Sequence, residues 1–130
     1  MYKKTETLSI VEVRAVEEIV RILYKDYPEL HERHGEKGKK HTVYDLKKHF
    51  EYIDAAFKLE SSQVFLDYIY WLYNVLSARG MENTKYLLAT FRIMKEQEFP
   101  TWSHERFKFY QAVLTDTIGW IQSQPKKDHE

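Results

Sequence analysis

Residues 61–80, SSQVFLDYIYWLYNVLSARG, decide the fold class because their apolar side chains recur at helical spacing between a start signal and a stop signal. Ser61 and Ser62 suit the N-cap of a helix, and Gly80 suits the residue after its C-terminal end. Residues three or four apart form two adjacent apolar stripes, the first Phe65, Ile69, Leu72 and Leu76, the second Tyr68, Trp71 and Val75. This spacing predicts a helix over residues 63–79.

The same criteria predict four more helices, over about residues 10–26, 43–60, 84–98 and 104–122. Their N-terminal signals are two capping-box pairs, Ser9 with Glu12 and Thr42 with Asp45, and the single caps Asn83 and Ser103. Residues 28–41 are predicted to be a long connection and residues 123–130 a disordered tail. Apolar and polar residues alternate nowhere for long enough to predict a strand.

These helices predict one all-α domain over residues 1–130, because a chain of this length holds a single core. Very short turns between the last three helices favour an antiparallel five-helix bundle. Globin-like oblique crossings stay open as an alternative, because helical periodicity does not determine the crossing angle between helices.

The composition limits the classes of partner. Twenty Lys and Arg residues balance 20 Asp and Glu residues, so no overall field attracts nucleic acid or an anionic membrane. We therefore expect neither partner, and any such binding would need a local patch. The chain has no Cys, which excludes disulfides, thiolate metal ligands and cysteine nucleophiles. The amino-terminal sequence contains no secretory signal, which predicts a cytoplasmic, soluble protein.

Local motifs for catalysis are missing. None of the six His residues has a Glu three positions before it, as di-iron bundles require, and the sequence contains no zinc-protease pattern, phosphate loop or dinucleotide fingerprint. We therefore expect no enzyme, no resident cofactor and no catalytic residues. His31, His34 and His41 lie together with several Glu residues in the predicted connection, which leaves two interpretations, a metal site or a solvated polar loop.

His49 differs from the other histidines because it lies beside the apolar stripe of the predicted helix over residues 43–60. It is either a histidine hydrogen-bonded at the edge of the core or part of a ligand pocket. In the second case we expect the pocket to be lined by His49, Phe50, Ile53, Tyr68 and Trp71.

The helix over residues 63–79 carries aromatic side chains on nearly every side, and one buried stripe cannot accommodate them all. Leu66, Tyr70 and Tyr73 form a row next to its polar face. Tyr combines a large apolar area with a polar group and is frequent in interfaces. The row is therefore a candidate interface, most simply between two copies of the chain in a homodimer.

Residues 42–98 resemble the helical module that precedes the cobalamin-binding domain in corrinoid-dependent bacterial regulators. The residues that carry the resemblance are His49-Phe50, Ile53, Ala56-Phe57, Phe65, Asp67-Tyr68, Trp71-Leu72, Leu76 and Ala78-Arg79-Gly80. The family implies a helical bundle that covers a cofactor or passes a signal to another domain. The Asp-x-His-x-x-Gly segment that would ligate cobalt is missing here. In size, class and aromatic content the chain is also similar to haem-less, globin-like sensor domains.

These observations predict a non-enzymatic regulatory or sensor module in bacterial signalling that acts by contact with a protein partner. The alternative is a small-molecule sensor that holds an apolar or tetrapyrrole-like ligand between its helices.

Overall fold

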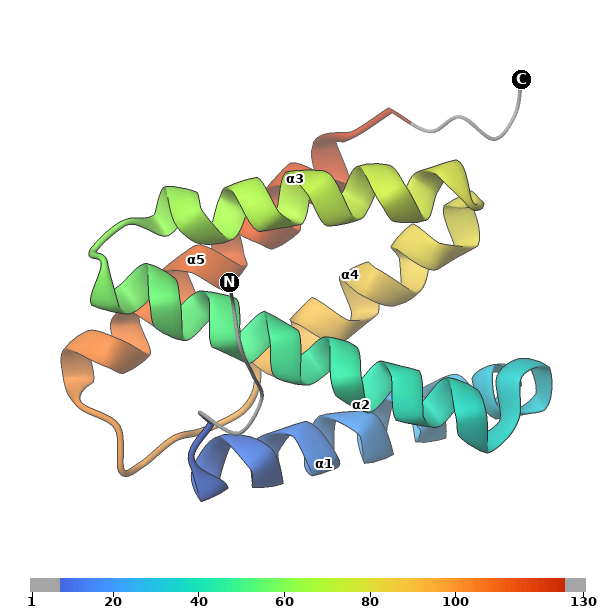
Figure 1. The fold of residues 1–130 in the computed structure, drawn as a ribbon, viewed down its shortest axis with the longest axis horizontal. Coiled ribbons are helices and arrows are strands. Elements are labelled where there is room, and N and C mark those ends of the chain that lie inside the picture. The colour runs from blue at the N-terminus through green and yellow to red at the C-terminus, as the bar shows by residue number, and fades with distance from the viewer. Residues whose placement is uncertain (1–7, 126–130) are drawn as a thin grey trace.

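Five helices surround one apolar core in the computed structural model, which describes residues 8–125 apart from the side chains of Met81 and Glu82 (Figure 1). The helices are α1 (Ile10–Asp26), α2 (Glu29–Lys58), α3 (Ser62–Ala78), α4 (Met81–Lys95) and α5 (His104–Ser123). The described residues form no strand. The predicted all-α bundle of five helices is therefore confirmed.

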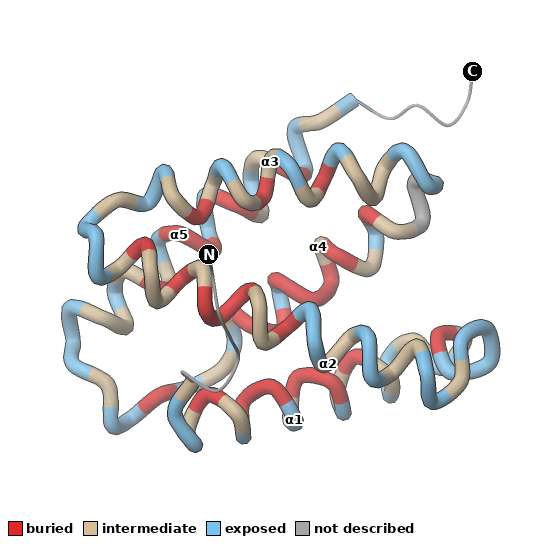
Figure 2. Tube along the Cα trace, in the orientation of Figure 1, coloured by how far each residue is buried: buried red, intermediate tan, exposed pale blue. Residues whose placement is uncertain are grey.

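Consecutive helices pack against each other, and α4 and α5 close the bundle. α4 contacts α1, α3 and α5, and α5 also contacts α2 and α3. Buried positions on all five helices face the middle of the molecule (Figure 2). Phe50, Phe65, Phe91 and Tyr110 are the largest fully buried side chains. Removing such a side chain from water contributes about 1.5 to 3 kcal/mol, so these rings are a main source of stability.

The predicted starts of α1 and α5 are confirmed. The Ser9 hydroxyl accepts a hydrogen bond from the backbone N–H of Glu12 at 3.3 Å, and the Glu12 carboxylate accepts one from the backbone N–H of Ser9 at 3.1 Å. At α5, the Ser103 hydroxyl accepts from the backbone N–H of Arg106 at 3.1 Å. Each cap satisfies backbone donors that have no partner within the helix.

The prediction that residues 28–41 form a connection is wrong, because α2 begins at Glu29 and residues 29–41 belong to this helix. Thr42 lies inside the helix, where its hydroxyl donates to the carbonyl oxygen of Gly38 at 3.1 Å, and so it is not an N-cap. The regular helix is interrupted only by non-helical backbone at Gly35 (φ 62°, ψ −157°). Tertiary contacts, such as the 2.8 Å hydrogen bond from the Tyr86 hydroxyl to Glu29, override the weak helix propensity of this glycine-containing segment.

The start of α4 also differs from the prediction. Gly80, with a φ of 129°, is the N-cap, and Asn83 lies in the first turn, where its side chain donates to the carbonyl oxygen of Leu76 at 3.4 Å. α4 ends at Lys95, three residues before the predicted end at residue 98. The predicted disordered tail lies mostly at residues 126–130, outside the described part of the chain.

Gly35 should be required for the break in α2, since its combination of φ and ψ is accessible essentially to Gly alone. We expect Gly35→Ala to lower the free energy of unfolding by about 1 to 3 kcal/mol. Gly119→Ala is the matched control, because Gly119 lies within α5 and an added Cβ meets nothing within 4 Å. The control should raise the stability by about 0.5 to 1 kcal/mol. Denaturant titration of both variants measures the difference, and a neutral Gly35→Ala would contradict the assignment.

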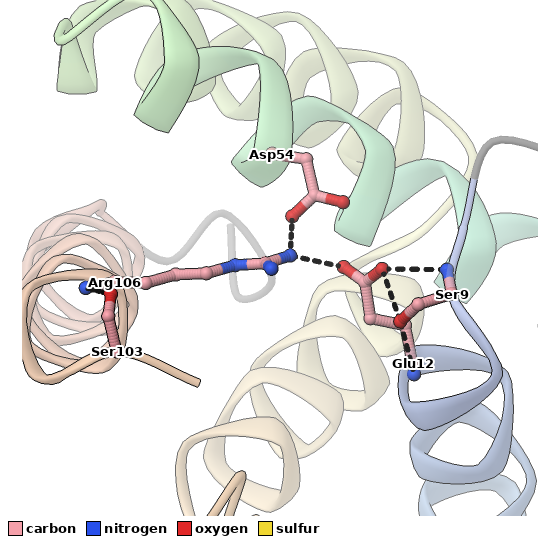
Figure 3. A network of polar contacts seen from close by, with 5 residues as sticks. All are labelled: Ser9, Glu12, Asp54, Ser103 and Arg106. Atoms are coloured by element: carbon pink, nitrogen blue, oxygen red, sulfur yellow. Dashed lines mark hydrogen bonds and ion pairs between the residues drawn. The ribbon is translucent and has the colours of Figure 1, made fainter. Parts of the chain in front are cut away.

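Arg106 of α5 ties the starts of α1 and α5 to the second half of α2 (Figure 3). One guanidinium nitrogen, Nη2, donates to Glu12 Oε2 at 3.0 Å and to Asp54 Oδ1 at 2.8 Å. The same guanidinium lies 4.0 Å from the centre of the Trp102 ring. We call the group of Glu12, Asp54 and Arg106 the carboxylate clasp.

The clasp brings two carboxyl groups to one cation in a largely buried place. Glu12 is 2% exposed, and its other oxygen, Oε1, serves the capping box with Ser9. Desolvation and a hydrogen bond with Glu12 raise the pKa of Asp54 to about 8, and Arg106 only partly offsets this rise. At neutral pH and below, the protonated form of Asp54 is therefore favoured.

Asp54→Asn should mimic this protonated state. Because the folded-state pKa of Asp54 lies above its ordinary value of 3.8, its contribution to stability is fully present below pH 3.8 and is lost as the pH rises to about 8. The Asn amide still donates to Glu12 and its oxygen still accepts from Arg106. We expect the stability of the variant relative to the wild type to increase with pH over this range. Denaturant titrations at several pH values, with Asp116→Asn on the exposed side of α5 as control, test this. A difference independent of pH would disprove it.

Candidate functional site

A cavity of about 510 Å³ lies between the end of α1, the first two thirds of α2, the end of α3 and the start of α4. Its size falls within the range typical of small-molecule sites. Five leucines from all four helices give it apolar walls: Leu23, Leu30, Leu46, Leu76 and Leu87. The break at Gly35 positions the first turns of α2 along one side.

His49 lines the cavity from α2 and is 3% exposed. Its Nδ1 lies 2.8 Å from the Tyr68 hydroxyl, and its ring centroid lies 5.0 Å from that of Phe91. Burial lowers the pKa of His49 to about 3, so the ring is neutral near pH 7.

A neutral imidazole has one nitrogen that donates and one that accepts. Tyr68 is the one hydrogen-bond partner that the described residues give the His49 ring, and it takes Nδ1. Nε2 therefore has no hydrogen-bond partner among the described residues and can bond to a bound molecule.

Cationic side chains surround the cavity. Arg33 from α2 and Arg79 at the end of α3 both line it, together with His34 and His41. Asp45 is the one carboxylate among the described lining residues. Burial raises the pKa of Asp45, and the nearby His41 lowers it by a smaller amount. Glu29, which accepts a hydrogen bond from Tyr86, lies close to Arg33 but does not line the cavity. The lining itself therefore carries two guanidinium groups against one carboxylate.

Polar hydrogen-bonding groups complete the lining. The Tyr24 and Thr42 hydroxyls lie 3.2 Å apart and join α1 to α2. On α4, the Thr90 hydroxyl donates to the carbonyl oxygen of Tyr86 at 2.8 Å. Together with the leucines, these groups give the cavity a lining that is about half apolar and half polar.

Of the five predicted pocket residues, His49 lines the cavity and Tyr68 contacts it through the hydrogen bond to His49. Phe50 and Ile53 are buried in the core, where Phe50 packs against Tyr110 with ring centroids 6.0 Å apart. Trp71 is 60% exposed on the outside of α3. Of the five side chains that were expected to line one pocket, His49 alone lines this cavity.

The predicted interface row contacts α5 of the same chain. Trp120 lies with its ring centroid 4.7 Å from that of Tyr70 and 5.2 Å from that of Tyr73. Tyr73 is buried, and Leu66 and Tyr70 are half-buried. Intramolecular packing thus accounts for much of the aromatic content of α3, and a homodimer through this row stays a prediction.

Arg33, Arg79, Tyr86 and Thr90 were not among the sequence-based candidates. Arg33 was not recognised as a candidate because residues 28–41 were predicted to be a loop. The other three come from α4 and the end of α3, and no spacing in the sequence connects them to His49. The pairing of Tyr86 with Glu29 across 57 residues illustrates why.

The described residues contain no group of three or more His, Asp or Glu side chains placed to hold a metal ion. His31 instead lies 3.2 Å from Glu36, while His34 and His41 face the cavity. Within the described chain, no helix combines the length and the apolar character needed to cross a membrane.

The sequence matches no protein-family model, and neither curated proteins nor solved structures contain a significant match. The resemblance of residues 42–98 to the module of corrinoid-dependent regulators therefore stays an expectation.

His49 should make the folded state sensitive to acid. Its folded-state pKa of about 3 lies below the ordinary 6.5, so its contribution to stability is present above pH 6.5 and is lost as the pH falls towards 3. The complete loss corresponds to about 4 to 5 kcal/mol. We expect His49→Phe to reduce the pH dependence of unfolding in this range, whereas His104→Gln, which removes an exposed histidine of α5, should leave it unchanged. Equal pH dependence of wild type and His49→Phe would contradict the neutral, buried state.

Proposed function

We propose that this protein is a sensor module that binds a small organic anion in the cavity between α1, α2, α3 and α4. The observation that carries the proposal is a buried, neutral His49 with a ring nitrogen available to a cavity whose rim bears Arg33 and Arg79. The sequence-based alternative is a sensor that holds an apolar or tetrapyrrole-like ligand between its helices. The ligand proposed here keeps that position but carries an acidic group.

The excess of positive over negative side chains at the rim of the cavity favours an anionic ligand. Two guanidinium groups face one carboxylate, Asp45, whose pKa is raised by burial. Guanidinium groups bind carboxylate, sulfonate and phosphate groups through paired hydrogen bonds that are stronger than neutral ones. The anionic group of the ligand would therefore lie near Arg33 or Arg79.

The leucines of the cavity lining favour a ligand with an apolar organic part. The leucines that line the cavity gain from contact with an apolar surface, whereas a bare inorganic ion would leave them in water. His49 adds one polar contact at the inner end, which suits a ligand that carries a hydroxyl, carbonyl or ring nitrogen away from its acidic group.

A ligand in this position would connect the first half of α2 to the turn between α3 and α4. The break at Gly35 separates Leu30, Arg33 and His34 from the cavity residues of α2 that follow it, so a contact with Arg33 would favour one orientation of the segment before the break. A change in that orientation is the response that a protein partner would detect. This mechanism keeps the module non-enzymatic and regulatory.

The test uses 8-anilinonaphthalene-1-sulfonate, which has an aromatic body and one sulfonate and becomes fluorescent in apolar sites. The double variant Arg33→Gln, Arg79→Gln should weaken dye binding about tenfold or more, because each charge-assisted hydrogen bond contributes roughly 1.5 to 3 kcal/mol. His49→Phe, which keeps the ring volume, should weaken it less.

Arg92→Gln is the control, since Arg92 is exposed on α4 outside the cavity. Native mass measurement of freshly purified protein shows in parallel whether a ligand is already bound. Dye binding that survives in the double variant but disappears in Trp71→Ala would place the dye on the exposed surface of α3 and would remove the support for the cavity.

A further inference from the structure

The outer face of α2 and α3 carries exposed aromatic rings next to lysines. Tyr44 is 53% exposed and Trp71 is 60% exposed, although both are large apolar side chains. Tyr68 connects the two helices here, because its ring stacks on Tyr52 with centroids 4.0 Å apart and lies 6.4 Å from the ring of Trp71. Tyr52, Tyr68 and Trp71 therefore form one group of neighbouring rings, and Tyr44 is a separate exposed ring on α2.

Lysines extend this surface along α2. Lys37, Lys40, Tyr44 and Lys47 are separated by three, four and three residues, so they lie on one stripe of the helix. Lys37, Lys40 and Lys47 form no ion pair within the described part of the chain. Lys48 lies 5.4 Å from the centre of the Tyr44 ring and 3.6 Å from the buried Glu51, which holds it against the ring. We call Lys37, Lys40, Tyr44, Lys47 and Trp71 the lysine–aromatic face.

Local charge on this face differs from the balance of the whole chain. Residues 37–48 contain five Lys and a single acidic residue, Asp45, whereas the complete sequence has a net charge of zero. A hollow of about 480 Å³ lies on this face and is lined by Lys37, Lys40, His41, Tyr44 and Asp45. The hollow is thus lined by two lysines and one tyrosine.

We propose that the lysine–aromatic face binds single-stranded nucleic acid, with phosphates at Lys37, Lys40 and Lys47 and bases stacked on Tyr44 and Trp71. Alternating cations and exposed rings are the combination that sequence-tolerant single-strand binding uses, because every base has a face that can stack. The balanced total charge gives no long-range field, and this face supplies the local patch that such binding needs.

Two other occupants fit the face less well. An anionic membrane binds a broad apolar helix face that inserts between lipids, but the other exposed large apolar side chains, Ile10 and Leu59, lie at the start of α1 and just after the end of α2. A second copy related by two-fold symmetry about the stripe would bring the lysines of both chains together, and like charges repel.

The experiment measures the fluorescence anisotropy of labelled oligothymidylate and oligouridylate, about twelve nucleotides long to cover one site. We expect the logarithm of the affinity to fall with the logarithm of salt concentration with a slope of about −2, because three lysines contact phosphates of a single strand. Trp71→Ala and Tyr44→Ala should each weaken binding about fivefold or more through lost stacking. Asp45→Asn should strengthen it by removing a negative charge from the hollow.

The variant Lys37→Ala, Lys40→Ala, Lys47→Ala should abolish most of the affinity and most of the salt dependence. Its matched control is Lys25→Ala, Lys58→Ala, Lys108→Ala, which removes three exposed lysines elsewhere and should bind like the wild type. All substituted lysines are at the surface, and circular dichroism confirms that both triple variants remain folded.

Three results would overturn the proposal. The first is the absence of oligonucleotide binding at low salt, and the second is equal loss of affinity in both triple variants. The third is binding of wild-type protein to phosphatidylglycerol vesicles, or self-association abolished by Trp71→Ala, without binding to either oligonucleotide. None of these outcomes depends on the cavity, so the proposed anion site is tested independently.

Discussion

Arg106 joins three helix segments that are far apart in the sequence, namely the start of α1, the second half of α2 and the start of α5. Its guanidinium group bonds to Glu12 across 94 residues and to Asp54 across 52 residues. Glu12 cannot leave this position without losing its capping bonds to Ser9, so the start of α1, the second half of α2 and the start of α5 are fixed together. The raised pKa of Asp54 favours its protonated form, which reduces the repulsion between the two carboxyl groups beside the one cation.

The end of the molecule opposite the clasp is held differently. There α2 is broken at Gly35, and the helices meet through hydrogen bonds, such as those of Tyr24 with Thr42 and of Tyr86 with Glu29, and through the packing of Tyr27 against Tyr86. This end contains the cavity, and His49 lies between it and the aromatic core. The proposed ligand-dependent change in the orientation of one segment would use the break in α2.

The two proposed binding surfaces adjoin at the middle of α2, since His41 and Asp45 line both the cavity and the outer hollow. They differ in chemistry. The cavity presents guanidinium groups and a buried neutral imidazole to a small anion, whereas the outer face presents flexible ammonium groups and exposed rings to an extended one. The lysines of the outer face and Arg33 of the cavity all lie on α2, so a local positive charge exists although the charges of the whole chain balance.

The sequence by itself determined the helical class and the ends of helices that depend on neighbouring residues. The capping box of Ser9 with Glu12 and the cap of Ser103 were predictable because each bond joins residues three apart. His49 was recognisable as unusual from its place beside an apolar stripe. Only the tertiary structure decided the start of α2, the cover of Tyr70 and Tyr73 by Trp120, and the meeting of Arg33, Arg79 and His49 around one cavity. These features depend on contacts between distant residues, and a local pattern carries no information about which distant residue will supply the partner.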